Sequence, residues 1–239
     1  MAKLPLYDKL DVIYEDNHLI AVNKPAGWLV HGDITGDKPM VDYVKQYIKV
    51  KYKKPGDVFL GVVHRIDRPV SGSLIFARTT KALTRMNKLF LDGDIQKVYW
   101  AITEKRPEPL IGRVEHWLWK DKAKNISRAY LTEPKKREKS KLSLLDYDFK
   151  GSISGYNFIE VRPHTGRPHQ IRVQLSAIGC PIKGDLKYGA AHANKDASIH
   201  LHCHSMTFIH PVKKEQITIK CKPDKKDQIW RLFKGNLFR

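Results

Sequence analysis

Apolar and polar residues alternate in short runs along most of the chain, and a period of two residues is typical of β-strands. Turn-forming residues separate the first of these runs, at residues 15–17 and again at residues 24–27. Most runs follow one another without a helical segment between them, which predicts a largely antiparallel sheet. The predicted strands cover residues 11–14, 18–23, 59–63, 73–76, 97–103, 113–119, 127–132, 142–149, 157–162, 200–209 and 216–220.

Four segments instead repeat their apolar residues at helical spacing, namely residues 40–50, 81–91, 166–179 and 226–233. In the third, Pro168 stands near the start and Gly179 at the exit, as expected for the two ends of a helix. On such a helix His169 and Arg172 are predicted to share a face away from the apolar stripe. Together the pattern predicts an α+β fold, with a mixed, largely antiparallel sheet flanked by helices, in a single domain over residues 1–239.

The net charge narrows the class of partner. The 239 residues carry 44 Lys and Arg against 25 Asp and Glu, a formal charge of +19. Residues 1–50 hold 6 basic and 7 acidic side chains, so residues 51–239 have a net charge of +20. A polyanion suits this field, because each phosphate neutralised by Lys or Arg releases condensed counterions. We therefore expect a nucleic acid as partner, and a merely soluble basic protein is the plainer alternative.

Cysteine content and hydropathy indicate the compartment. Cys180, Cys203 and Cys221 form neither an even set nor a close pair, which argues against a disulfide framework or a thiolate zinc site and fits a reducing compartment. The first residues carry acids instead of a basic segment followed by an apolar one, and no stretch nears 18 uninterrupted apolar residues. We expect a cytoplasmic protein that is not secreted and does not span a membrane.

A polar loop with the sequence HRIDRPVSG, residues 64–72, interrupts two apolar strands. It brings an acid, several bases, a hydroxyl and a glycine into nine residues, and reactive groups are often carried by loops on a rigid scaffold. Taken alone, Asp67 is more simply a turn or capping aspartate, and His64 a histidine at a strand end. A second cationic segment, residues 162–172, has helix capping and a solvated basic face as its plainer interpretation. Tyr99, in a predicted strand, is by itself most simply a core residue.

Five blocks of the sequence resemble the RluA-type branch of the pseudouridine synthases. They occur in the order of that family from about residue 11 to residue 211, and they keep HRID and GRxHQIR intact, which makes the resemblance specific. The blocks are IYEDNHLIAVNKPAGWLVH, HRIDRPVSGSLIFAR, KVYWAI, TGRPHQIRVQL followed by PIKGDLKYG, and LHCHSMTFIHP.

The resemblance implies that the chain isomerises a specific uridine to pseudouridine in structured ribosomal or transfer RNA, without a cofactor or a metal. It implies Asp67 as the nucleophile or essential carboxylate, Tyr99 against the target base, and Arg172 as the ion-pair partner of Asp67. Other residues expected to contact RNA are His64, Arg65, Arg68, Lys97, Arg167 and His169. The first block begins near residue 11, so we expect one catalytic domain without the amino-terminal RNA-binding module that relatives often carry. We also expect a monomer.

This chemistry needs a carboxylate that stays ionised in a dry site. Burial alone would favour the protonated form of Asp67, whereas a guanidinium such as that of Arg172 favours the charged form. The target base must also leave its helix, and the ring of Tyr99 is expected to contact it, with proton abstraction from the sugar as a second possible role. Attack on the base, attack on the sugar and a glycal route all remain open.

Three alternatives remain. His200, His202 and His204 alternate along a strand and could form a metal cluster. An RNA-binding protein of the same fold that does not isomerise uridine would share the basic surface. A hydrolase could use Asp67 and His64, but the sequence suggests no third residue to complete a catalytic triad with them.

Overall fold

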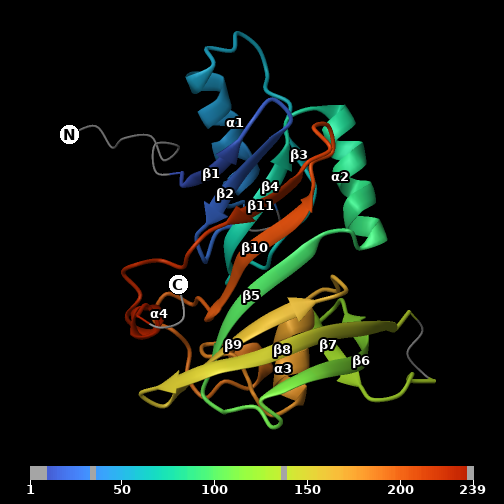
Figure 1. The fold of residues 1–239 in the computed structure, drawn as a ribbon, viewed down its shortest axis with the longest axis vertical. Coiled ribbons are helices and arrows are strands. Elements are labelled where there is room, and N and C mark those ends of the chain that lie inside the picture. Colours follow the sequence, from blue (N-terminus) through green and yellow to red (C-terminus); the bar gives the residue numbers. More distant parts are fainter. Residues whose placement is uncertain (1–9, 33–35, 136–138, 236–239) are drawn as a thin grey trace. The chain divides into compact units, whose positions relative to one another are not determined.

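The computed structural model describes residues 10–32, 36–135 and 139–235. The chain divides into two compact units. The first holds the chain up to Ile95 together with Cys203–Lys222, and the second holds Gln96–His202 together with the chain from Pro223 onward. Each unit has strands and helices of its own (Figure 1).

The sheet of the first unit has the strand order β1-β2-β4-β10, with β3 paired to β4 and β11 to β10. The pairs β1–β2, β2–β4, β3–β4 and β10–β11 are antiparallel. The first residues of β10 lie in the second unit. The strands are β1 (Val12–Glu15), β2 (Leu19–Lys24), β3 (Gly61–Val62), β4 (Ser71–Ala77), β10 (Leu201–Ile209) and β11 (Gln216–Lys220).

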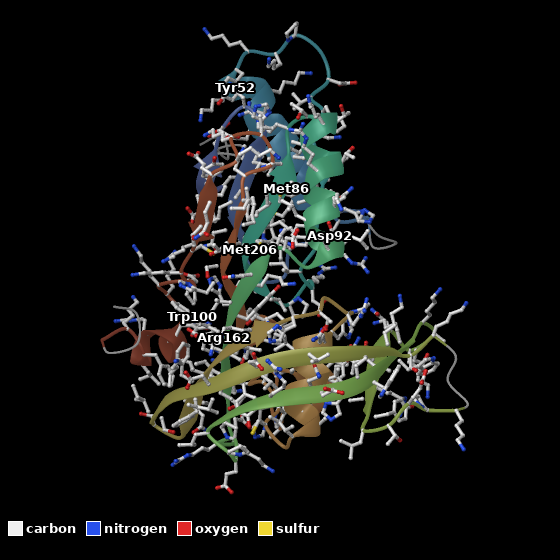
Figure 2. All side chains as sticks on the ribbon, turned by 45° about the vertical axis from the view of Figure 1, so that its right-hand side comes forward. Tyr52, Met86, Asp92, Trp100, Arg162 and Met206 are labelled. Carbon is white, nitrogen blue, oxygen red and sulfur yellow. The ribbon has the colours of Figure 1, made fainter. Side chains whose placement is uncertain are left out.

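The central strands of this unit are covered on both faces. Consecutive residues of a strand point to opposite faces, and residues 19–22 of β2 and 74–77 of β4 are all fully buried. This is why both strands read as continuous apolar runs and not as alternating ones. Met86 of the helix α2 (Thr80–Asp92) and Met206 of β10, labelled in Figure 2, are also buried in this unit.

Two helices of this unit match the predicted periodicity. Helix α1 (Met40–Lys51) buries residues four apart, at positions 40, 44 and 48. Helix α2 (Thr80–Asp92) begins after Thr79, whose side chain accepts a hydrogen bond from the backbone N–H of Ala82. It ends at Gly93, where a φ of 82° requires the left-handed conformation that glycine adopts without strain.

The sheet of the second unit has the strand order β5-β9-β8-β6-β7, and all its neighbours are antiparallel. Its strands are β5 (Gln96–Thr103), β6 (Ile111–Asp121), β7 (Ile126–Tyr130), β8 (Lys141–Ile153) and β9 (Tyr156–Pro163). The helices are α3 (Gln170–Ala177), the 3₁₀ turn η2 (Leu186–Tyr188) and α4 (Gln228–Leu232). The predicted strands and their antiparallel order are therefore confirmed.

Opposite faces of this sheet pack against different helices. The cross-strand register places Trp100 of β5 and Leu118 of β6 on opposite faces. Trp100, labelled in Figure 2, clusters with Trp230 of α4. Leu118 clusters with Val173 of α3 and with Tyr188.

Helix α3 is shorter than the predicted segment of residues 166–179. It begins at Gln170, because His169 has a left-handed backbone with a φ of 55° and so cannot continue a helix. The prediction that His169 and Arg172 share a helix face is therefore wrong. Arg172 also does not face solvent, since only 5% of its surface is exposed.

No helix in the described part of the chain is long and apolar enough to cross a membrane. All three cysteines are buried thiols.

Candidate functional site

The loop that carries Asp67 lies in the first unit, between β3 and β4. Two apolar residues, Ile66 and Val70, anchor it with exposures of 7% and 2%. Between them the backbone turns, and the N–H of Val70 donates to the carbonyl of Asp67 at 3.0 Å. Asp67 itself is half-buried. The loop thus holds a carboxylate at the surface of a well-packed segment.

The imidazole of His64 is engaged within its own unit. Its Nε2 atom accepts a hydrogen bond from the backbone N–H of Ile75 at 3.0 Å, and its ring stacks on Phe90 of α2 at 4.9 Å. The lone pair of Nε2 is therefore not available to take a proton from a substrate. This weakens the hydrolase alternative, which needs His64 as a base beside Asp67.

The two arginines of the loop are exposed. Arg68 donates from Nε to the carbonyl of Gly27 at 3.0 Å and from its terminal nitrogen to Asp37 at 2.6 Å. In return the N–H of Gly27 donates to the carbonyl of Arg68 at 2.7 Å. These bonds join the loop to the turn that follows β2, while Arg65 faces solvent.

A buried lysine, Lys24 at the end of β2, contacts both the loop and the turn that these bonds join. Its side chain is fully buried and its ammonium donates to the backbone carbonyls of Pro25, Trp28 and Arg68. Burial lowers the pKa of Lys24 to about 7, while the negative charge of Asp67 opposes that change. The charge on Lys24 is thus close enough to interact with the charge on Asp67.

The predicted strand residues Lys97 and Tyr99 lie on β5 of the second unit, and both are half-buried. Tyr99 pairs with Val161 of β9. The neighbouring Trp100 points to the opposite face of the sheet and packs in the apolar cluster around Trp230 of α4, which we call the α4 core. This alternation keeps the ring of Tyr99 out of that core.

Arg172 is held by a buried carboxylate in the second unit. Its guanidinium donates from Nε to one oxygen of Asp185 at 2.6 Å and from a terminal nitrogen to the other at 2.8 Å. The two side chains are 6% and 1% exposed. The ring of Tyr188 lies 5.0 Å from the guanidinium, within range of a cation–π contact. The predicted ion pair between Asp67 and Arg172 would join the two units, and it stays a prediction.

The segment before α3 is fixed by hydrogen bonds to its own side chains. The amide oxygen of Gln170 accepts from the hydroxyl of Thr165 at 2.8 Å and from the backbone N–H of Arg167 at 3.0 Å. His169 places Nδ1 2.7 Å from the hydroxyl of Tyr188. The Nε atom of Arg167 is buried and has no hydrogen-bond partner among the described residues.

Two of the three histidines near β10, His200 and His202, lie with their rings against Trp230. His200 also lies 3.3 Å from the carboxylate of Asp227. His204 places Nδ1 2.8 Å from a backbone carbonyl. Within residues 10–32, 36–135 and 139–235, no group of three or more His, Cys, Asp or Glu side chains has the arrangement of a metal site.

Two residues at these sites, Lys24 and Asp185, were not singled out from the sequence. Both lie in motif blocks, NKPAGWLVH and PIKGDLKYG. The one available signal was the position of Lys24 directly at the end of the run LIAVN, before the turn at Pro25. Lys and Asp are rarely fully buried unless they are paired.

A family model described as RNA pseudouridylate synthase matches residues 18–177, about two thirds of the chain. The chain belongs to this family. The matched residues include Asp67, Tyr99 and Arg172. The resemblance seen in the motif blocks is therefore confirmed, and the chain is an RNA pseudouridine synthase by family.

Curated pseudouridine synthases cover most of this chain. The tRNA pseudouridine synthase C of Haemophilus influenzae is 32% identical over 225 residues, which are 88% of this chain and 91% of that protein. The ribosomal large subunit pseudouridine synthase D of Zymomonas mobilis is 32% identical over 218 residues, 87% of this chain and 67% of that protein.

The solved structure of human RNA pseudouridylate synthase domain containing 4 has the same fold. It is 24% identical in sequence, has a TM-score of 0.76, and is covered over 92% of each chain. The α+β fold class with its pseudouridine-synthase-like sheet is confirmed.

Proposed function

We propose that this pseudouridine synthase modifies a specific uridine in structured ribosomal or transfer RNA, with Asp67 as its essential carboxylate. The observation that carries the proposal is the family match over residues 18–177, which contains the HRID loop of Asp67. Relatives named for transfer RNA and for the large ribosomal subunit support the two RNA classes.

The reaction needs few groups. The C1′–N1 bond breaks and a C1′–C5 bond forms, the proton on C5 is lost, and N1 takes up a proton. The isomerisation involves no net oxidation or reduction of the substrate, and no group is donated from outside it. An ionised carboxylate that attacks the sugar or the base, or that moves these protons, is sufficient. Asp67 is given this role here.

Arg172 is proposed as the counter-ion of Asp67. A buried arginine fixed by Asp185 presents its charge in one orientation, because a planar guanidinium bound at two nitrogens cannot turn. An oriented cation favours the ionised form of a carboxylate that approaches it. The support for this pairing is the preorganised guanidinium and the position of both residues in motif blocks.

Tyr99 is proposed to contact the base after it leaves its helix. Extrusion costs a few kcal/mol of stacking, and contact with an aromatic ring returns about 1–3 kcal/mol per base. The half-buried ring of Tyr99, which does not fill the α4 core, supports this role.

RNA contacts outside the reacting base are proposed for the cationic side chains near these residues. We propose that the exposed Arg65 and Arg68 bind phosphates, which set register without reading bases. Lys97 and Arg167 are half-buried and are proposed to act closer to the target nucleotide. We assign His64 and His169 to the same RNA-contacting set, although each also has a partner in its own unit.

The two units are proposed to act together as one catalytic domain in a cytoplasmic monomer. The family match crosses from the first unit into the second, which supports one catalytic domain made of both units.

The test uses transcripts of the source organism's ribosomal and transfer RNAs that carry tritium at C5 of uridine. Formation of pseudouridine releases this tritium to water. We expect release from a single site in one of the two RNA classes. If neither the ribosomal nor the transfer RNAs release tritium while the protein still binds RNA, the result would instead favour an RNA-binding protein that does not isomerise uridine.

A further inference from the structure

Lys24 is among the largest side chains that the first unit buries completely. It ends β2, directly after residues that form the apolar core of the sheet. An ammonium in such a place is costly unless hydrogen bonds replace its water. Its partners therefore explain why a lysine occupies this position.

Those partners are three backbone carbonyls. The Nζ atom donates to Pro25 at 2.9 Å, to Trp28 at 2.9 Å and to Arg68 at 3.2 Å. An ammonium has three N–H donors, so each carbonyl can take one of them. Two of the carbonyls belong to the turn after β2, and the third belongs to the loop of Asp67.

The third bond fixes the peptide between Arg68 and Pro69, one residue beyond Asp67. The carbonyl of Arg68 also accepts from the N–H of Gly27 at 2.7 Å, so two donors hold the same oxygen. Within the same turn, the N–H of Val70 binds the carbonyl of Asp67. The backbone that follows the Cα of Asp67 is thereby held at two successive carbonyls, and Lys24 and Gly27 tie the second of them to the end of β2 and the turn after it. The charge of Asp67 also attracts the charge of Lys24.

We infer that Lys24 is a positioning residue, which fixes the loop so that Asp67 meets the uridine in a reactive geometry. The inference rests on the proposed role of Asp67. Because Lys24 is fully buried, it does not touch RNA and acts through the backbone of the loop. A misplacement of about 1 Å at a reacting group can cost about 100-fold in rate.

The test compares Lys24→Met with Lys49→Met. Methionine keeps most of the length of the side chain and removes all three donors, and Lys49 is an exposed lysine of α1 in the same unit. We expect Lys24→Met to lower kcat for tritium release by about 100-fold and to leave the KM for RNA within about twofold. Lys49→Met should leave kcat unchanged.

Amide hydrogen exchange supplies a readout that does not depend on activity. In Lys24→Met, the amides of Gly27 and Val70 should exchange at least about tenfold faster, because the loop that protects them is released. Amides of β8 in the second unit should not change. If the wild-type protein releases no tritium, the proposed function is wrong. Hydrogen exchange at Gly27 and Val70 in Lys24→Met would still show whether Lys24 holds the loop.

Lys24→Gln guards against a variant that fails to fold. Glutamine retains two N–H donors without the charge, so it should fall between wild type and Lys24→Met in both measurements. Unchanged exchange at Gly27 and Val70 would overturn the inference, whatever happens to kcat. A kcat within twofold of wild type in a variant whose loop exchanges faster would also overturn it.

Discussion

Replacing Asp185 by alanine removes the carboxylate that accepts two hydrogen bonds from the guanidinium of Arg172. Both side chains are almost fully buried, with exposures of 1% and 6%. Water cannot take the place of the lost carboxylate at that depth. Breaking a buried ion pair by removing one partner costs about 3–5 kcal/mol. Since a whole domain is stable by about 5–15 kcal/mol, this is a large part of the total.

A matched surface pair in the same unit isolates the effect of burial. Arg113 binds Asp146 with the same two-nitrogen geometry, at 2.7 and 3.2 Å. Here the arginine side chain is 59% exposed. Asp146 also contacts His164 at 2.7 Å, so the control substitution is made at the arginine. Exposed ion pairs contribute about 0–1 kcal/mol, so Arg113→Ala should cost no more than about 1 kcal/mol. If geometry alone decided the energy, the two substitutions would cost the same.

A third variant separates loss of the pair from loss of volume. The double substitution of Arg172→Met with Asp185→Leu removes both charges and keeps apolar bulk in the site. Replacement of a whole buried pair by well-packed apolar residues is often neutral or stabilising. We therefore expect the double variant to be more stable than Asp185→Ala, even though it changes more atoms. It should have no activity if Arg172 is the counter-ion of Asp67.

The assay is urea unfolding at pH 7, followed by tryptophan fluorescence and extrapolated linearly to water. Asp185→Ala should lose about 3–5 kcal/mol of unfolding free energy and Arg113→Ala about 1 kcal/mol or less. A loss below about 1 kcal/mol for Asp185→Ala would refute the reasoning, because burial would then add nothing to the pair.

Two further predictions concern the first unit. A Cβ atom at Gly72 would lie 2.5 Å from the backbone nitrogen of Cys203, and the φ of this glycine is 123°. Gly72→Ala should therefore cost about 3 kcal/mol or more in urea unfolding, whereas Gly56→Ala, with open space around it, should cost almost nothing. Burial acts to raise the pKa of Asp16, but backbone hydrogen bonds, including that from Leu19, lower it to about 2. A lowered pKa stabilises the fold above the unfolded value near 4, and this part, about 2 kcal/mol, is lost as the pH falls toward 2. The unfolding free energies of wild type and Asp16→Asn should converge over that range, and a constant difference would contradict the assignment.

Local patterns were sufficient to predict most of the strands. The run at 97–103 and strand β5 (Gln96–Thr103) differ by one residue, and the alternation correctly separates Tyr99 from Trp100. Local spacing works here because the sheet is antiparallel, and its neighbours often follow each other in sequence. Helix α2 was also well predicted, since both of its ends have capping residues.

The start of α3 could not be found from spacing. The apolar repeat begins only at Ile171, and Pro168 suggested an earlier start. His169 instead takes a left-handed backbone, and its Nδ1 lies 2.7 Å from the hydroxyl of Tyr188. That contact comes from a residue 19 positions later in the chain. A tertiary contact therefore overrides the local pattern, and no window of sequence contains it.

The buried charges were missed for a related reason. Lys24 and Asp185 lie in segments whose neighbours suggest turns, where charged residues are ordinary. Their burial depends on carbonyls and a guanidinium brought in by other elements. Motif blocks marked both positions, but the interactions that make them structural exist only in the folded chain.

The central claim is that isomerisation depends on the carboxylate of Asp67. The direct measurement is single-turnover tritium release by wild type, Asp67→Asn and the exposed control Asp57→Asn, with RNA binding followed in parallel. We predict that Asp67→Asn binds RNA as wild type does and releases no tritium, while Asp57→Asn is fully active. Tritium release by Asp67→Asn at a rate near that of wild type would contradict the account.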